Sequence, residues 1–325
     1  MLCCCGRPLN GSHDHNTCGP PIPEDGSIAF LYTESFLWEK TIGFALQNIC
    51  ETHNFLYKPL PYIGGHIRGF RQVLEHQEVD ENCKIFCCEQ NPDFKEHDER
   101  LLRQKFPNAK LACFTGDSIY YGYPDAFPWT VDLWLDTVKI AVNKTTKFPA
   151  EHFYWSVSET ILRDIQASAL ECGAKSRWFI SLCHSNSGER TRFMNDLKYS
   201  GREVLWNQNL WELRPIYELY AKSWFALGHT TPVHDNKARS MKGFRDWLAP
   251  ALDCLLIYDD YPDIRDLEIV PTYKYLDAGE VIRLTDLLRN NPKLYQDFLE
   301  KQKKWAWDNS LEQQIERLFK KYGFL

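Results

Sequence analysis

The residues best suited to chemistry gather in one stretch of the chain, from Ala238 to Asp263. It begins with three cations, Arg239, Lys242 and Arg245, set among aromatic and apolar residues. It then closes into the apolar run 255–257, which is typical of a buried parallel strand and is followed by polar residues. Because ligands of α/β sheets bind at the carboxyl ends of strands, the cations are candidates for holding an anion. Taken singly, each cation also fits the solvated face of a helix.

A second cluster of candidate anion ligands lies upstream of this stretch. An apolar strand is predicted over 178–183 and a helix over 191–198. The loop between them consists of small polar residues, which let backbone amides approach an anion where the helix dipole favours one. Two arginines can add charge-assisted hydrogen bonds. The candidates are Ser185, Ser187, Gly188, Arg190 and Arg192. An ordinary turn is the alternative interpretation of this loop.

The elements that must position these residues alternate between strands and helices. Strands are predicted over 28–32, 55–57, 84–88, 110–115, 178–183, 203–206, 224–228 and 255–257. Helices are predicted over 36–51, 67–78, 94–106, 159–172, 191–198 and 213–223. The alternation predicts an α/β fold of two Rossmann-like domains with parallel sheets. We also expect a last strand region of the first domain within 131–142, a strand over 280–284 and a last amphipathic helix over 301–325.

Three residues of the first half follow predicted strands and are candidates for proton transfer. Glu34 follows the first strand, His66 the second and Asp117 the fourth, and each could activate an acceptor hydroxyl as a general base. The alternatives are a helix N-cap for the turn around Glu34, a surface turn for His66 and a self-bonded turn for Asp117. If the segment 131–142 were helical, Asp132 and Asp136 would share one face, and solvation at the surface is the commoner meaning of such a pair. Neither has a His or Cys partner at metal-ligand spacing, so we expect no metal site.

The cationic stretch and its surroundings resemble a known family. The segment 238–263, continued forward through 282–292 and back to about Trp178, is similar to the donor domain of GT-B glycosyltransferases. The CgeB-like group of bacterial and phage enzymes, related to glycosyltransferase family 1, resembles it most. The resemblance implies that Arg239, Lys242 and Arg245 bind the pyrophosphate of a nucleotide-sugar and that Asp246 makes a polar donor contact.

The chain departs from the family pattern at two positions. Leu248 stands where many GT-B enzymes have a ribose-binding glutamate, and Asp253 replaces a turn glycine. Either Asp246 or Asp253 substitutes for the glutamate, or the donor is held differently, or catalysis has been lost.

The resemblance implies a transferase that moves a sugar from a nucleotide-sugar to an acceptor hydroxyl. Fixed cations would stabilise the leaving nucleoside diphosphate, so no metal or other cofactor is expected. The acceptor can be a glycan, a protein or a hydroxymethylated base of phage-type DNA, and inversion and retention both stay open. The alternatives are a non-catalytic GT-B-like protein that binds a nucleotide or a partner, and a nucleotide-sugar epimerase of GT-B shape.

The expected domain organisation follows from the same comparison. Residues 1–26 form a flexible Cys/Pro/Gly-rich tail, 27–150 an acceptor domain and 151–304 a donor domain. The helix 305–325 would cross back onto the first domain. The four cysteines and two histidines of the tail are alternative zinc ligands, although no C-x-x-C spacing is present.

Composition narrows the class of protein further. The net charge of −6 and the pI near 6.0 argue against a general nucleic-acid binder. No apolar run approaches the roughly 20 residues that span a bilayer, and no apolar signal segment opens the chain. Most of the 12 cysteines lie in predicted core strands, which indicates buried thiols and a reducing compartment. We therefore expect a cytoplasmic protein, or one in the host cytoplasm if it is viral.

Overall fold

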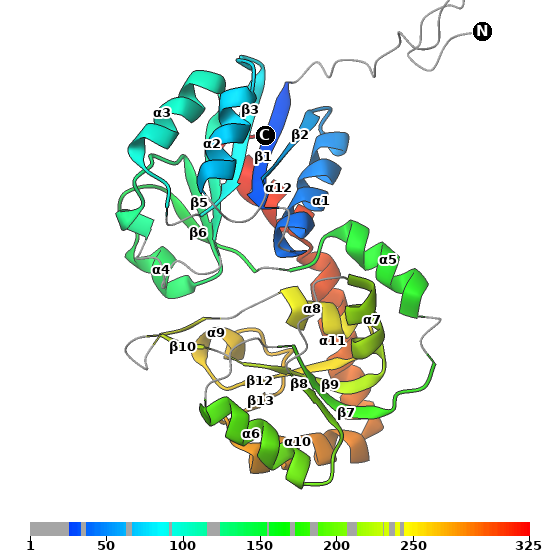
Figure 1. Cartoon of the computed structure of the whole chain (residues 1–325). Coiled ribbons are helices and arrows are strands. Elements are labelled where there is room, and N and C mark those ends of the chain that lie inside the picture. Colours follow the sequence, from blue (N-terminus) through cyan, green and yellow to red (C-terminus); the bar gives the residue numbers. More distant parts are fainter. Residues whose placement is uncertain are drawn as a thin grey trace, which may run out of the picture.

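The chain folds into two lobes, each built on a parallel β-sheet with helices on both faces (Figure 1). The structure is a computed structural model. It describes residues 26–33, 37–62, 67–90, 93–115, 124–154, 156–169, 173–182, 188–206, 213–229, 231–233, 238–240 and 244–325. This architecture confirms the predicted fold class of two Rossmann-like domains. The predicted tail, 1–26, lies outside the described residues except for Gly26.

The first sheet has the strand order β2-β1-β3-β4-β5-β6. Its strands are β1 (Ser27–Thr33), β2 (Leu56–Tyr62), β3 (Cys83–Glu89), β4 (Lys110–Thr115), β5 (Leu133–Asp136) and β6 (Ala150–His152). The helices are α1 (Leu37–Thr52), α2 (Ile67–His76), α3 (Glu96–Lys105) and the short α4 (Lys139–Lys144), with a 3-10 turn at Pro124–Ala126. The edge strand β2 carries Pro59 and Pro61. Proline is tolerated there because an edge strand leaves one row of N–H groups unpaired.

The second sheet has the order β13-β12-β9-β7-β8. Its strands are β7 (Arg177–Ser181), β8 (Val204–Trp206), β9 (Ser223–Gly228), β12 (Leu255–Asp259) and β13 (Thr272–Tyr273). The helices are α5 (Glu159–Ala169), α6 (Gly188–Tyr199), α7 (Leu213–Ala221), α8 (Phe244–Ala251), α9 (Pro262–Arg265), α10 (Ala278–Asn290), α11 (Pro292–Asp308) and α12 (Leu311–Lys321). A separate antiparallel pair consists of β10 (Thr231–Val233) and β11 (Ala238–Ser240).

Two predicted elements are wrong. The segment 280–284 is helical, in α10, because Asp277 caps the helix by accepting from the Glu280 amide. Val281 and Leu288 are buried, and their spacing of seven residues, about two helical turns, places them on the same helix face. The strand region predicted within 131–142 is confirmed: Asp136 lies in β5 and Asp132 just before it, so the two carboxylates do not share a helix face. The single terminal helix over 301–325 is two helices, because Ser310 caps α12 through the Gln313 amide.

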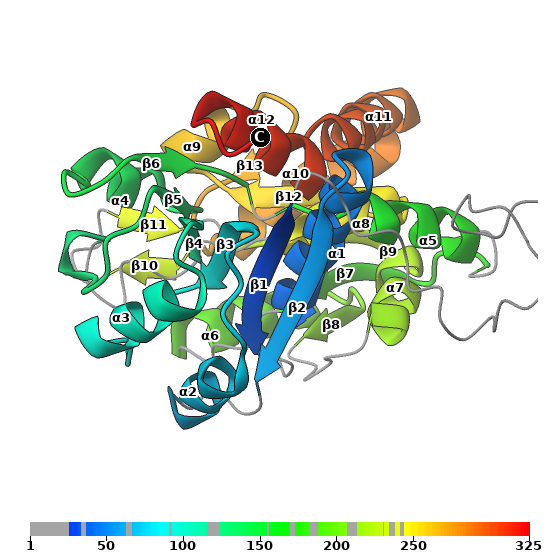
Figure 2. The same cartoon turned by 90° about the horizontal axis from the view of Figure 1, so that it is seen from above.

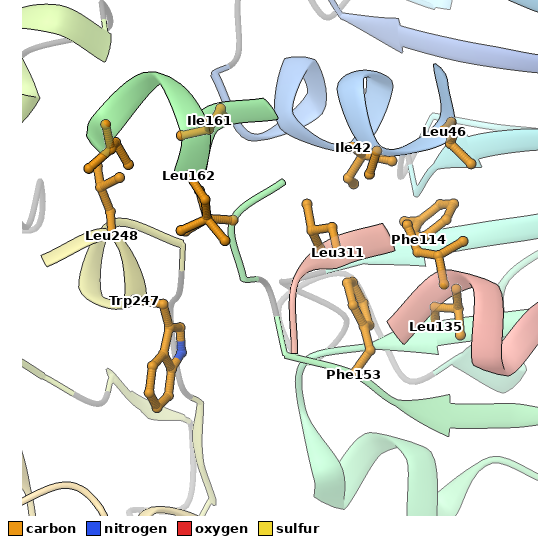
Figure 3. Packing of buried hydrophobic residues seen from close by; sticks show 14 of the residues in the cluster. Ile42, Leu46, Phe114, Leu135, Phe153, Ile161, Leu162, Trp247, Leu248 and Leu311 are labelled. Atoms are coloured by element: carbon orange, nitrogen blue, oxygen red, sulfur yellow. The ribbon is translucent and has the colours of Figure 1, made fainter. Parts of the chain in front are cut away.

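One hydrophobic cluster runs continuously through both lobes. It joins the inner face of the first sheet to α1, α5, α7, α8 and α12. Figure 3 shows Ile42 and Phe114 of the first lobe on one side, Leu311 of α12 among them, and Ile161 and Trp247 on the other. The shared core, together with the return of α12 to α1, confirms that the C-terminal helix crosses back onto the first domain (Figure 2).

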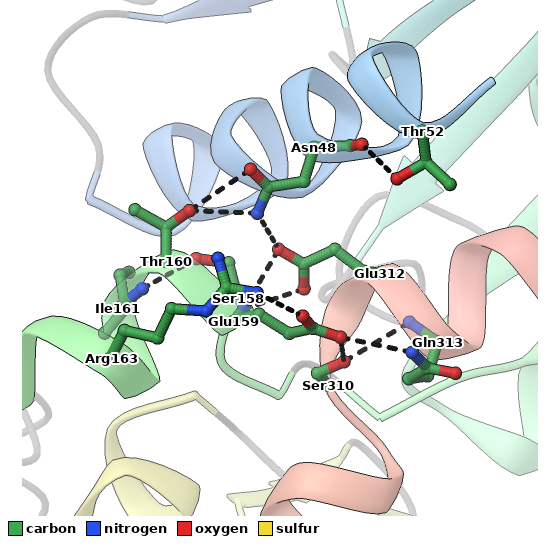
Figure 4. Close-up of polar contacts among 10 residues, drawn as sticks. All are labelled: Asn48, Thr52, Ser158, Glu159, Thr160, Ile161, Arg163, Ser310, Glu312 and Gln313. Atoms are coloured by element: carbon green, nitrogen blue, oxygen red, sulfur yellow. Dashed lines mark hydrogen bonds and ion pairs between the residues drawn. The ribbon is translucent and has the colours of Figure 1, made fainter. Parts of the chain in front are cut away.

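A buried polar joint reinforces the same junction (Figure 4). The Glu312 carboxylate of α12 accepts hydrogen bonds from the Glu159 amide at 3.0 and 2.9 Å, at the start of α5. It also accepts from Asn48 Nδ2 of α1 at 2.7 Å, and Asn48 in turn bonds Thr160. The joint therefore ties three helices that are far apart in the sequence, and it fixes how the lobes meet.

Two other predictions concern the surface and the thiols. In the described ranges no helix has the length and hydropathy needed to cross a bilayer. The thiols of Cys83, Cys87, Cys88, Cys113 and Cys254 are free and buried, as predicted, whereas Cys183 lies outside the described residues.

Candidate functional site

In each sheet the strand order reverses at one point. The reversal in the second sheet locates the candidate site. In the second sheet, β7 is flanked by β8 on one side and β9 on the other. In α/β sheets ligands bind at the carboxyl ends of the strands beside such a reversal, here beside β7 and β9. Helix α6 follows β7, and His229 follows the last residue of β9. Two candidate ligands thus border the switch point of the second sheet.

His229 is held at this edge by aromatic side chains. Its ring lies 5.4 Å from that of Phe193 in an edge-to-face arrangement, and its Nδ1 lies 2.9 Å from the Tyr273 hydroxyl. The side chain is almost entirely buried, with 6% of its surface exposed. Burial, together with the positive charge of Arg190, lowers the pKa of His229 to about 3. The imidazole is therefore neutral at physiological pH.

The backbone that carries His229 is fixed by a close aromatic contact. A Cβ atom at Gly228 would lie 1.8 Å from Cδ2 of Tyr258, so any larger residue would displace that ring. The Tyr258 hydroxyl donates to the His229 carbonyl at 3.2 Å, and the Tyr273 hydroxyl to the Gly228 carbonyl at 3.0 Å. Glycine is needed here because the backbone and the ring approach so closely. The end of β9 is thus a rigid support for the imidazole.

Arg190 lies on the other side of the switch point, in the first turn of α6. Its side chain is only 2% exposed, although it carries a charge. Gly188, which begins the helix, and Arg192 are both exposed. A helix N-terminus and a buried guanidinium both favour an anion. The structure therefore brings together Gly188, Arg190 and His229 from the connections after β7 and β9.

The structure describes only some of the predicted site residues. Glu34, His66, Asp117, Ser185, Ser187 and Lys242 lie outside the described residues. The backbone is described for Arg239, in β11, and for Arg245 and Asp246, in the first turn of α8. For these residues the expected roles stay predictions.

The prediction for Asp253 needs correction. Asp253 lies just before β12, at the amino edge of the sheet, whereas ligands of α/β sheets bind at the carboxyl edge. Its carboxylate pairs with Lys303 of α11 at 2.5 Å. Its φ of 60° is in the left-handed region that glycine favours. Asp253 therefore occupies a left-handed turn position and lies away from the edge at which a ligand would bind.

Leu248 also has a structural explanation. Its side chain is fully buried in the hydrophobic cluster that joins the lobes, beside Trp247 (Figure 3). Trp247 stacks on Trp305 with ring centroids 3.8 Å apart. A carboxylate at this position would be buried among apolar side chains at a cost of several kcal/mol. Leucine at 248 is therefore a core residue of the junction between the lobes.

The carboxyl edges of the two sheets approach each other on one side. Lys139, three residues after β5, pairs with Asp266, which ends α9 after β12, at 3.2 Å. At the first sheet's switch point, between β1 and β3, Gln90 follows β3 and accepts from the Thr115 hydroxyl at 2.8 Å. Within the described ranges, no group of three or more metal-ligating side chains is present.

Sequence reasoning missed His229 and Tyr273. The available signal was a histidine placed directly after the strand predicted over 224–228, at a carboxyl end. Tyr273 gave no such signal, because its strand has only two residues. Its contact with His229 spans 44 residues of sequence and depends on the order of the strands.

Comparison with known proteins identifies the fold. No protein-family profile matches the sequence, and no curated protein matches it. Among solved structures, the chain is similar to HepE of Anabaena in complex with UDP and glucose, with 9% identity, a TM-score of 0.55, and 91% of this chain and 99% of that one covered. It is also similar to a UDP-forming alpha,alpha-trehalose-phosphate synthase from Burkholderia vietnamiensis, with 8% identity, a TM-score of 0.58 and coverage of 91% and 97%.

A third structure belongs to a different class. A protein from Listeria monocytogenes described as a putative UDP-N-acetylglucosamine 2-epimerase has 10% identity, a TM-score of 0.51 and coverage of 85% and 91%. At such low identity these likenesses establish the fold alone. The chain has the GT-B fold, in which two Rossmann-like domains are combined.

Proposed function

We propose that this chain is a glycosyltransferase that moves a sugar from a nucleotide-sugar to an acceptor hydroxyl. The observation that carries the proposal is the buried Arg190 beside the neutral imidazole of His229 at the switch point of the second sheet. A buried cation at the ligand-binding edge of an α/β sheet is a candidate ligand for an anion. The GT-B fold, which HepE shares in a complex with UDP and glucose, supports the same assignment.

The proposed chemistry assigns a charge-stabilising role to the second lobe. Transfer breaks the bond between the sugar and the nucleoside diphosphate, so negative charge develops on the leaving diphosphate. Arg190 and the N-terminus of α6 would stabilise that charge. Arg239, Lys242 and Arg245 are proposed as further cationic contacts, and Asp246 as a polar donor contact. With these fixed charges we propose a reaction without a required metal.

The acceptor is assigned to the first lobe. In the sequence, Glu34, His66 and Asp117 come after the segments that form β1, β2 and β4. We propose that one of them activates the acceptor hydroxyl if the reaction inverts. A glycan, a protein and a modified DNA base are the proposed acceptor classes, and the CgeB-like group and a cytoplasmic location are proposed with them.

Binding to nucleotide-sugars tests this function first. We expect one class among UDP-, GDP-, ADP- and CMP-sugars to raise the melting temperature, since a ligand that binds only the native state stabilises it. Arg190→Met should abolish the shift. Arg100→Met is the matched control, because Arg100 lies exposed on α3 of the other lobe. A full set of nucleotide-sugars without any shift would contradict the proposal.

The fate of the sugar then separates transfer from epimerisation. After incubation with the binding nucleotide-sugar and candidate acceptors, a transferase releases free nucleoside diphosphate and a glycosylated product. An epimerase leaves the sugar on the nucleotide with one inverted carbon. Mass spectrometry of the acceptor and chromatography of the nucleotide distinguish these outcomes.

A further inference from the structure

The imidazole of His229 has an unused nitrogen at the candidate site. Among the described residues, no hydrogen-bond partner reaches its Nε2, although that atom is buried. A buried polar atom without a partner costs about 1–3 kcal/mol. Its neighbour Nδ1 has a well-defined partner, the Tyr273 hydroxyl at 2.9 Å. The unused nitrogen therefore points to a group that the described part of the chain does not supply.

The surrounding hydrogen bonds determine which nitrogen of the neutral imidazole carries the proton. The Tyr273 hydroxyl has a single proton, and it donates this proton to the Gly228 carbonyl at 3.0 Å. The same hydroxyl must then accept from His229, so Nδ1 carries the imidazole proton. In the neutral ring Nε2 is consequently a lone-pair acceptor. Nε2 can accept a hydrogen bond, but it cannot donate one.

Because Nε2 is an acceptor, the ligand group that binds it must be a hydrogen-bond donor. Phosphate oxygens at neutral pH are acceptors, so they gain nothing from an acceptor nitrogen. Hydroxyl groups are donors, and sugar rings flank both ends of the diphosphate in a nucleotide-sugar. Arg190, whose charge lies close enough to act on the pKa of His229, is the group suited to the phosphates.

We propose that His229 Nε2 accepts a hydrogen bond from a hydroxyl of a sugar ring attached to the diphosphate of the bound donor. The inference rests on the proposed function and deepens it, because it assigns a specificity contact within the same site. The hydroxyl belongs either to the ribose or to the transferred sugar. Tyr273 is a positioning residue, since it holds the imidazole in the accepting tautomer.

Two substitutions separate the two nitrogens of the ring. In His229→Asn the side chain ends near the Nδ1 position, so the contact with Tyr273 can persist while the Nε2 acceptor is lost. In His229→Gln the side chain reaches the Nε2 position with a carbonyl oxygen that can accept. Melting temperatures of both variants show that they fold. Binding is measured by calorimetry with UDP, GDP and ADP, their 2′-deoxy and 3′-deoxy forms, and UDP-, GDP- and ADP-glucose.

The expected result is a coupling between one hydroxyl and Nε2. Wild type should bind the critical analogue about 10-fold more weakly than its parent. His229→Asn should bind parent and analogue equally, and His229→Gln should recover most of the difference. If the hydroxyl belongs to the ribose, a deoxynucleotide shows the loss. If it belongs to the transferred sugar, the gain of the nucleotide-glucose over the bare nucleotide disappears in His229→Asn.

Two results would overturn the inference, and they differ in scope. If nucleotides bind but His229→Asn weakens every ligand by the same factor, Nε2 reads no hydroxyl and only this inference fails. If wild type binds none of the nucleotides and no other nucleotide-sugar, the proposed function fails and the inference with it.

Nitrogen NMR gives a readout that a purely structural role would not move. The Nε2 resonance of the free protein should have the shift of an unprotonated nitrogen, and it should move on ligand binding. In Tyr273→Phe the two tautomers should mix, and affinity for the hydroxyl-bearing ligand should fall by about 3- to 10-fold. A protonated Nε2 in the free wild-type protein would contradict the assigned tautomer.

Discussion

The polar joint between the lobes and the carboxyl edge of the second sheet each contain a buried polar side chain, Glu312 and His229, but they differ in how these side chains are used. In the joint, both oxygens of Glu312 accept hydrogen bonds, from the Glu159 amide and from Asn48 (Figure 4). At the edge, His229 keeps Nε2 open among the described residues. A saturated cluster holds the fold together, whereas an unsaturated one leaves binding capacity for a ligand.

Among the substitutions that test this difference between the joint and the edge, Arg190→Met should have the largest effect. Arg190→Met keeps much of the side-chain volume but removes the charge, so nucleotide affinity should fall about 100-fold, given about 1.5–3 kcal/mol for a charge-assisted hydrogen bond. Calorimetry with the nucleotide-sugar that binds wild type measures this loss. Arg100→Met should leave affinity unchanged. Equal affinity in the two variants would remove Arg190 from the site.

Substitutions in the joint should lower the stability of the fold and not the affinity for nucleotides. Glu312→Ala leaves the Glu159 amide and Asn48 without their acceptor, and we expect the free energy of unfolding to fall by about 2–3 kcal/mol. Glu312→Gln retains one acceptor oxygen and loses the buried charge, so its cost should be smaller. Chemical denaturation measures both. Nucleotide affinity should not change in Glu312→Gln, and a marked change would show that the joint is coupled to the site.

The neutral, buried His229 should make the folded protein lose stability at acidic pH. The pKa of His229 is about 3 in the folded protein and 6.5 in the unfolded chain. Below pH 6.5 the unfolded chain therefore binds a proton that the native protein does not bind. The stability is fully present above about pH 6.5 and is lost as the pH falls towards 3. Between pH 7 and 5 wild type should therefore lose on the order of 2 kcal/mol more than His229→Gln. Parallel pH profiles of the two proteins would assign the loss to other groups.

The smallest effect is expected where polar groups are exposed. The pair between Lys139 and Asp266 joins the lobes, but the two side chains are 45% and 67% exposed. Water and salt screen such pairs, so Lys139→Met should change the free energy of unfolding by no more than about 0.5 kcal/mol. Denaturation at low and high salt measures it. A loss near that of Glu312→Ala would mean that exposed contacts, too, hold the lobes together.

The sequence by itself determined the α/β class and most strands of the chain. Apolar runs such as 110–115 and 28–32 became β4 and β1 with shifts of at most one residue, because buried parallel strands need nearly continuous apolar residues. It also indicated Arg190 beside a helix start. It failed for 280–284, where the Asp277 cap and the spacing of Val281 and Leu288 favour a helix over a short apolar strand.

Only the tertiary structure decided which polar residues have all their partners and which do not. Nothing local distinguishes Glu312 from other acidic residues of an amphipathic helix, and its partners Asn48 and Glu159 are 264 and 153 residues away. The open nitrogen of His229 likewise depends on Tyr273, which the strand order brings to the end of β9. Local patterns fix elements because periodicity and capping act over a few residues. Saturation of buried polar groups is set by contacts between elements, which only the folded chain defines.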